Sequence, residues 1–261
     1  MDAKQVVYCE EDALAYTSAR RRFEPGEALR FDESYRLAHL PLISPSHPAA
    51  LRSAPGTDYQ DGRYNAERYS LVVPVDFRDL AASAAFQALE LELRNSCFTT
   101  KIAFDLCEQR ASKLHVTIGN GLPQSGLGPR AQAVARQLAK LGSVRFRLLG
   151  PFLGFKNTGR IYFPAYPESV GGQDAFGLIQ DALGVPRTRF YVLGYYNLLD
   201  ELDLDQTSAL QRIVDAWSHI KICDVQSNTC LIQATNDDLV LSGRPVIGID
   251  ASGQVRPFGH V

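Results

Sequence analysis

Hydrophobic and polar residues begin to alternate regularly at residue 68. Over residues 69–77 every second side chain is apolar, which predicts a half-buried strand. Over residues 82–93 the apolar positions instead recur at the spacing of one helix face. The chain therefore passes from a strand to a helix within about two dozen residues.

The same two patterns continue through the rest of the chain. Further strands are predicted at 99–106, 114–118, 144–149, 159–163, 189–195, 229–235 and 239–249, the last broken near Gly243. Further helices are predicted at 129–141, 173–183 and 205–217. A turn-rich loop separates residue 119 from the helix at 129. This mixture of strands and helices is typical of an α+β protein.

The two halves of this region repeat the same order of elements. His115–Gly119 aligns with Phe190–Gly194, and a helix is predicted to begin about ten residues after each of these glycines. An internal repeat present in two copies predicts a pair of lobes, because a solenoid needs at least three copies. We place the first lobe at about 68–143 and the second at about 144–249, within one domain that spans 68–261.

Residues 1–67 form a segment of different character, which we call the leader. It contains five prolines and few periodic apolar runs. We expect a loop-rich N-terminal extension with one short helix near residues 10–22, able to wrap the core, cover a cleft or remain partly mobile.

Composition restricts the possibilities without choosing among them. Hydrophobic residues make up 45% of the 261 residues, enough for a packed core, and the net charge of −2 argues against nonspecific nucleic-acid binding over the whole surface. The five cysteines form no C-x-x-C pair, which predicts reduced thiols and no metal site. The sequence shows no signal peptide and no apolar run of about 18 residues, so we expect a cytoplasmic protein without a membrane anchor.

His115 and Thr117 are the sharpest candidates for chemistry. Side chains two positions apart leave the same face of a strand, so both can reach one phosphate oxygen. The imidazole can exchange a proton near neutral pH, and the hydroxyl can bond a nonbridging oxygen. The simpler alternative is a half-buried strand histidine that bonds a backbone carbonyl, in an unrelated α+β protein where H-x-T occurs by chance.

The context of this motif resembles a known family. Lys113–Gly119 is similar to the first signature of the 2H phosphoesterases, the superfamily of RNA ligase and cyclic phosphodiesterase-like enzymes. Leu193–Asn197 and then Asp203–Leu210 resemble the segment that follows the second signature, and the resemblance covers about 68–245. It implies two lobes, each an antiparallel sheet backed by helices, with two H-x-[S/T] pairs in the cleft between them. It also implies a metal-independent reaction on 2′,3′-cyclic phosphates, 2′–5′ linkages or related nucleotide phosphodiesters.

The second signature departs from the family pattern. Phe190 and Val192 stand where His and Ser or Thr are expected, and neither can transfer a proton. Three interpretations remain open: hydrolysis is lost and binding kept, a different acid acts, or the register is shifted so that Arg189 and Tyr191 face the cleft. The candidates for a different acid are Arg189, Tyr191, Tyr195 and Tyr196. In a binding role, Phe190 can stack on a base.

The sequence thus favours a metal-independent phosphoesterase that acts on a nucleotide or RNA-end phosphodiester without a cofactor. His115 and Thr117 are its predicted catalytic residues, and Arg189, Phe190, Tyr191 and Tyr195 its predicted substrate-binding residues. The alternative is a noncatalytic nucleotide- or RNA-binding protein. Arginines concentrate in the second half, and several of them in the cleft would attract a phosphate: Arg145, Arg147, Arg160, Arg187 and Arg189.

Overall fold

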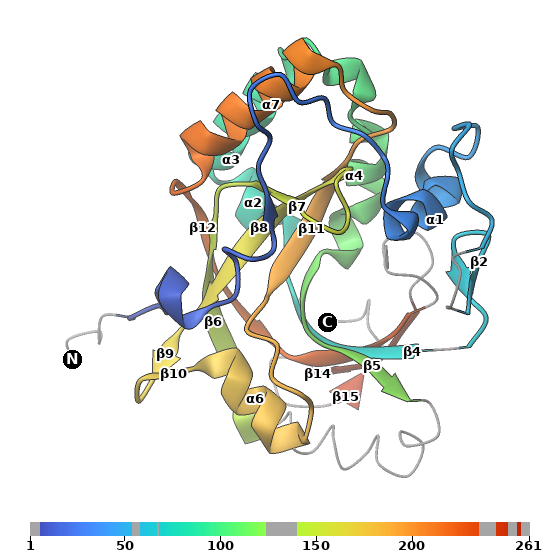
Figure 1. Cartoon of the computed structure of the whole chain (residues 1–261). Coiled ribbons are helices and arrows are strands. Elements are labelled where there is room, and N and C mark those ends of the chain that lie inside the picture. The colour runs from blue at the N-terminus through green and yellow to red at the C-terminus, as the bar shows by residue number, and fades with distance from the viewer. Residues whose placement is uncertain are drawn as a thin grey trace.

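Two antiparallel sheets carry most of the strands in the computed structural model, which describes residues 6–53, 58–66, 68–123, 140–234, 244–249 and 255–256 (Figure 1). The first sheet has the order β15-β14-β13-β4-β5. Its strands are β4 (Arg68–Pro74), β5 (His115–Pro123), β13 (Cys230–Ala234), β14 (Arg244–Ile249) and β15 (Val255–Arg256). Every pairing in it is antiparallel.

The second sheet has the order β1-β7-β8-β6-β12, and β11 pairs with β8 off this path. Its strands are β1 (Arg20–Arg21), β6 (Ser143–Leu149), β7 (Phe152–Gly154), β8 (Arg160–Pro167), β11 (Val192–Asn197) and β12 (Lys221–Asn228). Two short ribbons pair β2 (Tyr59–Gln60) with β3 (Arg63–Tyr64), and β9 (Ser169–Val170) with β10 (Gln173–Asp174).

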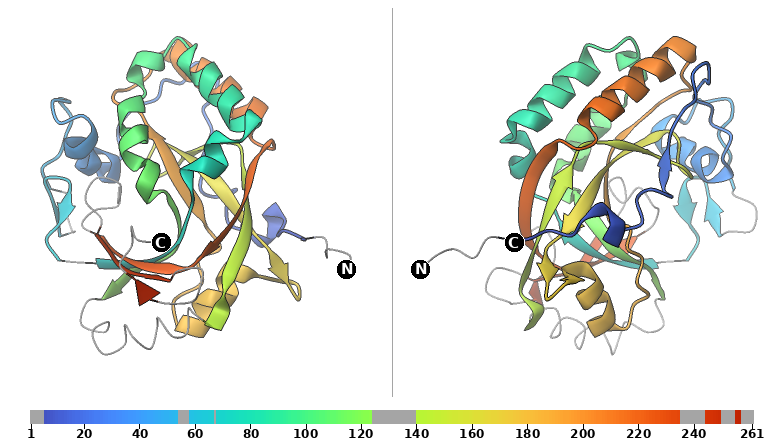
Figure 2. Two further views of the ribbon diagram at one scale, coloured as in Figure 1. Left: turned by 180° about the vertical axis from the view of Figure 1, so that it is seen from behind. Right: turned by 60° about the vertical axis from the view of Figure 1, so that its left-hand side comes forward.

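Helices cover these sheets from two ends, with α3, α4 and α7 at one end and α6 at the other (Figure 1). The helices are α1 (Ser34–Ile43), α2 (Phe77–Ala81), α3 (Ala84–Arg94), α4 (Phe104–Arg110), α6 (Ala175–Leu183) and α7 (Leu204–Trp217). Single 3-10 turns lie at Glu11–Ala13, Thr99–Lys101 and Ala111–Lys113. Helices α3 and α7 lie side by side (Figure 2), and α2 and α3 contact β12. The prediction of an α+β protein with antiparallel sheets backed by helices is confirmed.

Local sequence explains the best-predicted helices. Helix α3 begins where the Ser83 hydroxyl accepts a hydrogen bond from the backbone N–H of Phe86, and it buries the apolar face that the periodicity indicated. Helix α7 begins with a capping box, in which Asp203 and Gln206 bond each other's backbone N–H groups. Both the cap and the apolar stripe lie within a few residues in the chain, so the sequence alone indicates them.

The segment 99–106 was expected to be a strand, and this is wrong. A 3-10 turn and the first residues of α4 occupy it, and only Ile102 forms a bridge, with Leu198. Its β-branched residues favour a strand locally, but a long-range contact overrides that preference. The Arg110 side chain is fully buried and donates to the carbonyl of Tyr195, which holds α4 as a helix against β11.

Strands β7 and β12 were not predicted. The alternation in β12 is broken by a register shift between Lys221 and Cys223, so its pattern does not stand out in the sequence. The predicted helix 129–141, apart from its last two residues, and the break near Gly243 lie outside the described residues. Within the described residues, no helix is both long and apolar enough to cross a bilayer.

The leader is not organised as its sequence suggested. The expected helix at 10–22 is replaced by one 3-10 turn and strand β1, while the main helix, α1, comes later. Apolar side chains of the leader belong to the same buried cluster as residues of both sheets: Leu14, Tyr16, Leu29, Phe31 and Leu40. Their partners are distant in sequence, so periodicity within the leader could not show them.

Candidate functional site

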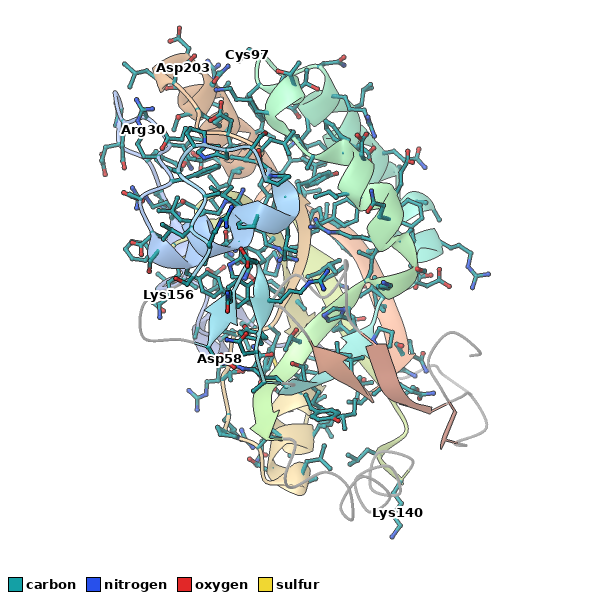
Figure 3. The ribbon with its side chains drawn as sticks, turned by 90° about the vertical axis from the view of Figure 1, so that its right-hand side faces the viewer. Arg30, Asp58, Cys97, Lys140, Lys156 and Asp203 are labelled. Atoms are coloured by element: carbon teal, nitrogen blue, oxygen red, sulfur yellow. The ribbon has the colours of Figure 1, made fainter. Side chains whose placement is uncertain are left out.

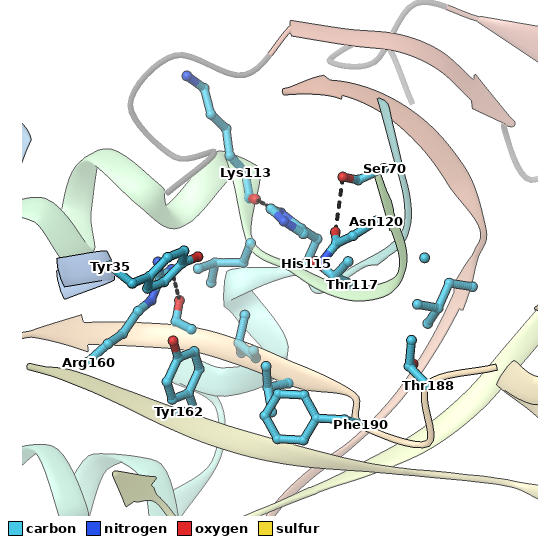
Figure 4. A pocket seen from close by; sticks show the side chains of 16 residues that line it. Tyr35, Ser70, Lys113, His115, Thr117, Asn120, Arg160, Tyr162, Thr188 and Phe190 are labelled. Carbon is cyan, nitrogen blue, oxygen red and sulfur yellow. Dashed lines mark hydrogen bonds between the residues drawn. The ribbon is translucent and has the colours of Figure 1, made fainter. Parts of the chain in front are cut away.

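A pocket of about 270 Å³ lies between β5 of the first sheet and β8 and β11 of the second (Figure 4). Helix α1 of the leader contributes Tyr35 to its rim. The residues that line it are Tyr35, Ser70, Lys113, Leu114, His115, Thr117, Ile118, Gly119, Asn120, Arg160, Tyr162, Thr188, Phe190, Val192, Leu193 and Gly194. His115, Thr117 and Phe190, three of the predicted site residues, therefore come together here.

Strand alternation places His115 and Thr117 in this pocket. Val116, between them, is fully buried in the core and does not line the pocket, whereas His115 and Thr117 are half-buried and line it. Pairing of His115 with Pro74 and of Thr117 with Val72 fixes the register of β5 against β4. The two side chains thus share one face of an edge strand.

The hydrogen bond of His115 determines which of its nitrogens can take a proton. Its Nδ1 lies 2.7 Å from the backbone carbonyl oxygen of Lys113. A carbonyl can only accept, so Nδ1 carries the hydrogen in this bond. In the neutral ring, Nε2 is then the nitrogen with the lone pair. A purely structural histidine would make the same bond to a backbone carbonyl. Here that bond also orients the ring so that Nε2 is the nitrogen able to accept a proton.

Phe190 and Val192 occupy the opposite side of the pocket. Tyr191, between them, is fully buried, and its hydroxyl lies 3.0 Å from a carboxylate oxygen of Asp174, to which it donates. Side chains therefore alternate here as they do at His115–Thr117. The alternative register placed Arg189 and Tyr191 in the pocket, and neither of them lines it.

The three tyrosines considered as replacement acids belong to the core. Tyr191, Tyr195 and Tyr196 are at most 1% exposed, and none of them lines the pocket. Burial raises the pKa of each phenol, with Asp174 adding to the effect at Tyr191. These phenols therefore stay protonated. Because their side chains are buried in the core, they do not contact a ligand in this pocket.

Arg160 supplies a positive charge next to β11. Its side chain is 8% exposed and its Nη2 donates to the carbonyl of Gly194 at 3.3 Å. Of the five arginines noted in the sequence, it alone lines the pocket. Arg145, Arg147 and Arg187 bond Gln226, Asp224 and Asp181, respectively, and Arg189 is exposed.

Sequence reasoning missed Lys113, Tyr162 and Tyr35 as pocket residues. Tyr162 follows Arg160 by two positions in β8, so strand periodicity could have indicated it, whereas Lys113 ends the 3-10 turn before β5 and has no such signal. Nothing in the sequence indicated Tyr35, because it comes from the leader. Arg160 carries a positive charge, whereas the side chain of Lys113 extends away from Arg160 and Tyr162 (Figure 4), and none of the described residues that line the pocket is acidic. Such a site favours an anion.

No group of three or more His, Cys, Asp or Glu side chains that could hold a metal occurs among the described residues. No protein-family model matches the chain, and no curated protein matches it. Any functional assignment therefore depends on the chemistry of the pocket itself.

Proposed function

We propose that this pocket binds the phosphate of a nucleotide or RNA-end phosphodiester, and that the protein is a metal-independent phosphodiesterase of the 2H type. The observation that carries the proposal is the orientation of His115. Its Nδ1 is held by a backbone carbonyl, and Thr117 lies beside it in a pocket to which Arg160 brings a positive charge and whose described lining residues include no carboxylate. A proton acceptor, a hydroxyl donor and positive charge are what displacement at phosphorus requires.

The proposed reaction is hydrolysis of a 2′,3′-cyclic phosphate. A water oxygen bonds to phosphorus while His115 Nε2 takes the proton of that water. The Thr117 hydroxyl donates to a nonbridging oxygen, and Arg160 offsets the negative charge that develops there.

The bond from phosphorus to one ribose oxygen then breaks, and that oxygen needs a proton. Phe190 and Val192 cannot supply it. We assign this step to the phenol of Tyr162, which lies in the same pocket (Figure 4). A phenol has an ordinary pKa near 10, so it serves better as an acid than as a base. Tyr162→Phe should then slow turnover by about 10²-fold, the usual scale for a general acid.

The arrangement of strands supports the further proposal that the protein consists of two pseudo-symmetric lobes with this pocket as their cleft. β4 pairs with β5 and β8 with β11, both antiparallel, and each pair presents alternate residues to the pocket, His115 and Thr117 from β5 and Arg160 and Tyr162 from β8. Failure of β4–β5 to superpose on β8–β11 would remove this part of the proposal.

The second candidate function is noncatalytic binding of the same ligands. The apolar pair Phe190 and Val192 favours it, because a binding site does not need a second proton-transfer group. In this case the wild type shows no turnover, and loss of His115 weakens only the affinity.

One assay separates the two functions. Wild type, His115→Ala and His219→Ala are tested against 2′,3′-cyclic nucleotides and short 2′–5′ and 3′–5′ oligonucleotides, with cleavage and binding both measured. For an enzyme, His115→Ala should lower kcat by about 10²-fold or more. His219 is exposed and outside the pocket, so His219→Ala should change nothing. Turnover should also survive EDTA, and a rate that depends on added Mg²⁺ or Mn²⁺ would contradict the proposed chemistry.

A further inference from the structure

A second cavity, of about 380 Å³, adjoins the phosphate pocket. It shares Tyr35, Tyr162 and Phe190 with that pocket, so one ligand can extend from one space into the other. Its remaining walls are formed by Ser18 and Ala19 of the leader and by residues 154–157, which join β7 to β8. Figure 3 shows Lys156 of this loop beside the leader. The two cavities together are large enough for a nucleotide.

Aromatic rings dominate this second cavity. Four of its nine lining residues are aromatic: Tyr35, Phe155, Tyr162 and Phe190. Phe155 is 49% exposed and Tyr35 is 40% exposed, although both are large apolar rings that folding usually buries. Exposed rings beside a phosphate site are typical of surfaces on which bases stack.

Asn157 adds a polar group that a base could use. Its side chain is 4% exposed, and its Oδ1 has no hydrogen-bond partner among the described residues. Nearby backbone bonds fix its loop, since the carbonyl of Asn157 accepts from the N–H of Arg160 and that of Gly159 accepts from Leu198. A buried acceptor without a donor is costly, and a ligand N–H group would remove that cost.

The leader completes this cavity. Pairing of β1 with β7, and a bond from the N–H of Phe155 to the carbonyl of Ala19, hold Ser18 and Ala19 against the β7–β8 loop. Helix α1 supplies Tyr35 from the other side. The site therefore depends on a segment outside the part of the chain that resembles the 2H phosphoesterases.

We propose that the second cavity is a nucleobase subsite, in which a base bearing an amino group stacks on Phe155 and its neighbours and donates to Asn157. The proposal relies on the proposed function for the position of the phosphate. It names the substrate class as a nucleotide with adenine, cytosine or guanine, whose exocyclic amino groups are hydrogen-bond donors.

Binding to the full chain tests this proposal with three probes: adenosine 3′-monophosphate, purine riboside 3′-monophosphate, which lacks only the amino group, and ribose 3-phosphate. The wild type should bind the adenosine compound about 10-fold more tightly than ribose 3-phosphate, the scale of one stacked base. Phe155→Ala should remove most of that difference and leave the affinity for ribose 3-phosphate unchanged. Asn157→Leu should abolish the preference for adenosine over purine riboside.

Controls keep the outcomes distinct. Phe155 is half-exposed, so its replacement should leave the fold intact, and Leu91→Ala provides an exposed apolar substitution outside both cavities. Equal affinity of the wild type for all three probes, with binding lost in His115→Ala, would overturn the subsite and leave the proposed function standing. A different outcome is that adenosine binding depends on Phe155 but changes neither when the phosphate is removed nor in His115→Ala. That outcome would support the subsite and overturn the proposed function.

Discussion

Gly194 shows how one residue without a side chain can shape a binding site. A Cβ atom built there would clash with Nε and Cζ of the Arg160 side chain. The guanidinium therefore packs directly on the backbone of β11, where it also donates to the Gly194 carbonyl. Glycine is required by this close approach and not by an unusual backbone angle.

We predict that Gly194→Ala displaces Arg160 and weakens phosphate binding by about 10-fold. Overpacking should also lower the free energy of unfolding by about 1–3 kcal/mol. Leu91→Ala is the control, because Leu91 is exposed and does not line the pocket. Isothermal titration with a nucleotide and urea denaturation measure the two effects. Unchanged binding in Gly194→Ala would show that Arg160 does not contact the ligand.

At the scale of elements, the leader is joined to the second sheet through Tyr16. The ring is fully buried, and its hydroxyl lies 2.5 Å from the carbonyl oxygen of Ala165 in β8 and 2.8 Å from that of Tyr191. The N–H of Ala15 donates to the carbonyl of Arg189. The leader thus lies against the chain just before β11, where Phe190 enters the pocket.

We predict that Tyr16→Phe lowers the free energy of unfolding by about 1–3 kcal/mol, because a buried hydrogen bond to carbonyl oxygens is lost while the ring remains. Urea denaturation measures the change. Tyr8→Phe serves as the comparison, since Tyr8 also lies in the leader but is only half-buried, so loss of its hydrogen bond to Asp224 should cost less. Equal stability of Tyr16→Phe and wild type would show that the ring alone, and not its hydroxyl, joins the leader to the sheet.

At the scale of the whole molecule, buried thiols and phenols make stability depend on alkaline pH. Burial raises the pKa of Cys223 to about 12 and that of Cys230 to about 12, from an ordinary value of 9.0. Burial likewise raises the pKa of Tyr166 to about 12. As the pH rises past 9 for the thiols and past 10 for the phenol, the unfolded chain releases these protons while the folded chain keeps them, so stability falls as pH rises towards 12.

We predict that the free energy of unfolding falls between pH 8.5 and 11 by about 2 kcal/mol for each of the two cysteines. Urea denaturation under reducing conditions, followed by fluorescence, measures this slope. Cys230→Ala should make the slope shallower, because one of the groups that titrate is gone. A stability that stays constant over this range would contradict the assigned burial of the thiols.

Features that depend only on neighbours along the chain can be predicted without the structure. Helices α3, α6 and α7 follow from apolar stripes and local caps, and β4, β5, β6 and β8 follow from short apolar patterns. The shared face of His115 and Thr117 also follows, because it needs only the two-residue period of a strand. The same period placed Phe190 and Val192 together on one face.

Which residues lie opposite these strand faces depends on the tertiary structure. That Phe190 lies across a pocket from His115, and that Tyr191 and Tyr195 turn into the core, depends on how two separate sheets pack. Tyr35, from the leader, lines both cavities, and Asn157, from the β7–β8 loop, lines the second. Neither segment has a periodic sequence pattern that could have predicted this. The physical reason is the same in each case: local preferences fix the direction of a side chain within its element, whereas contacts between distant segments decide what lies opposite.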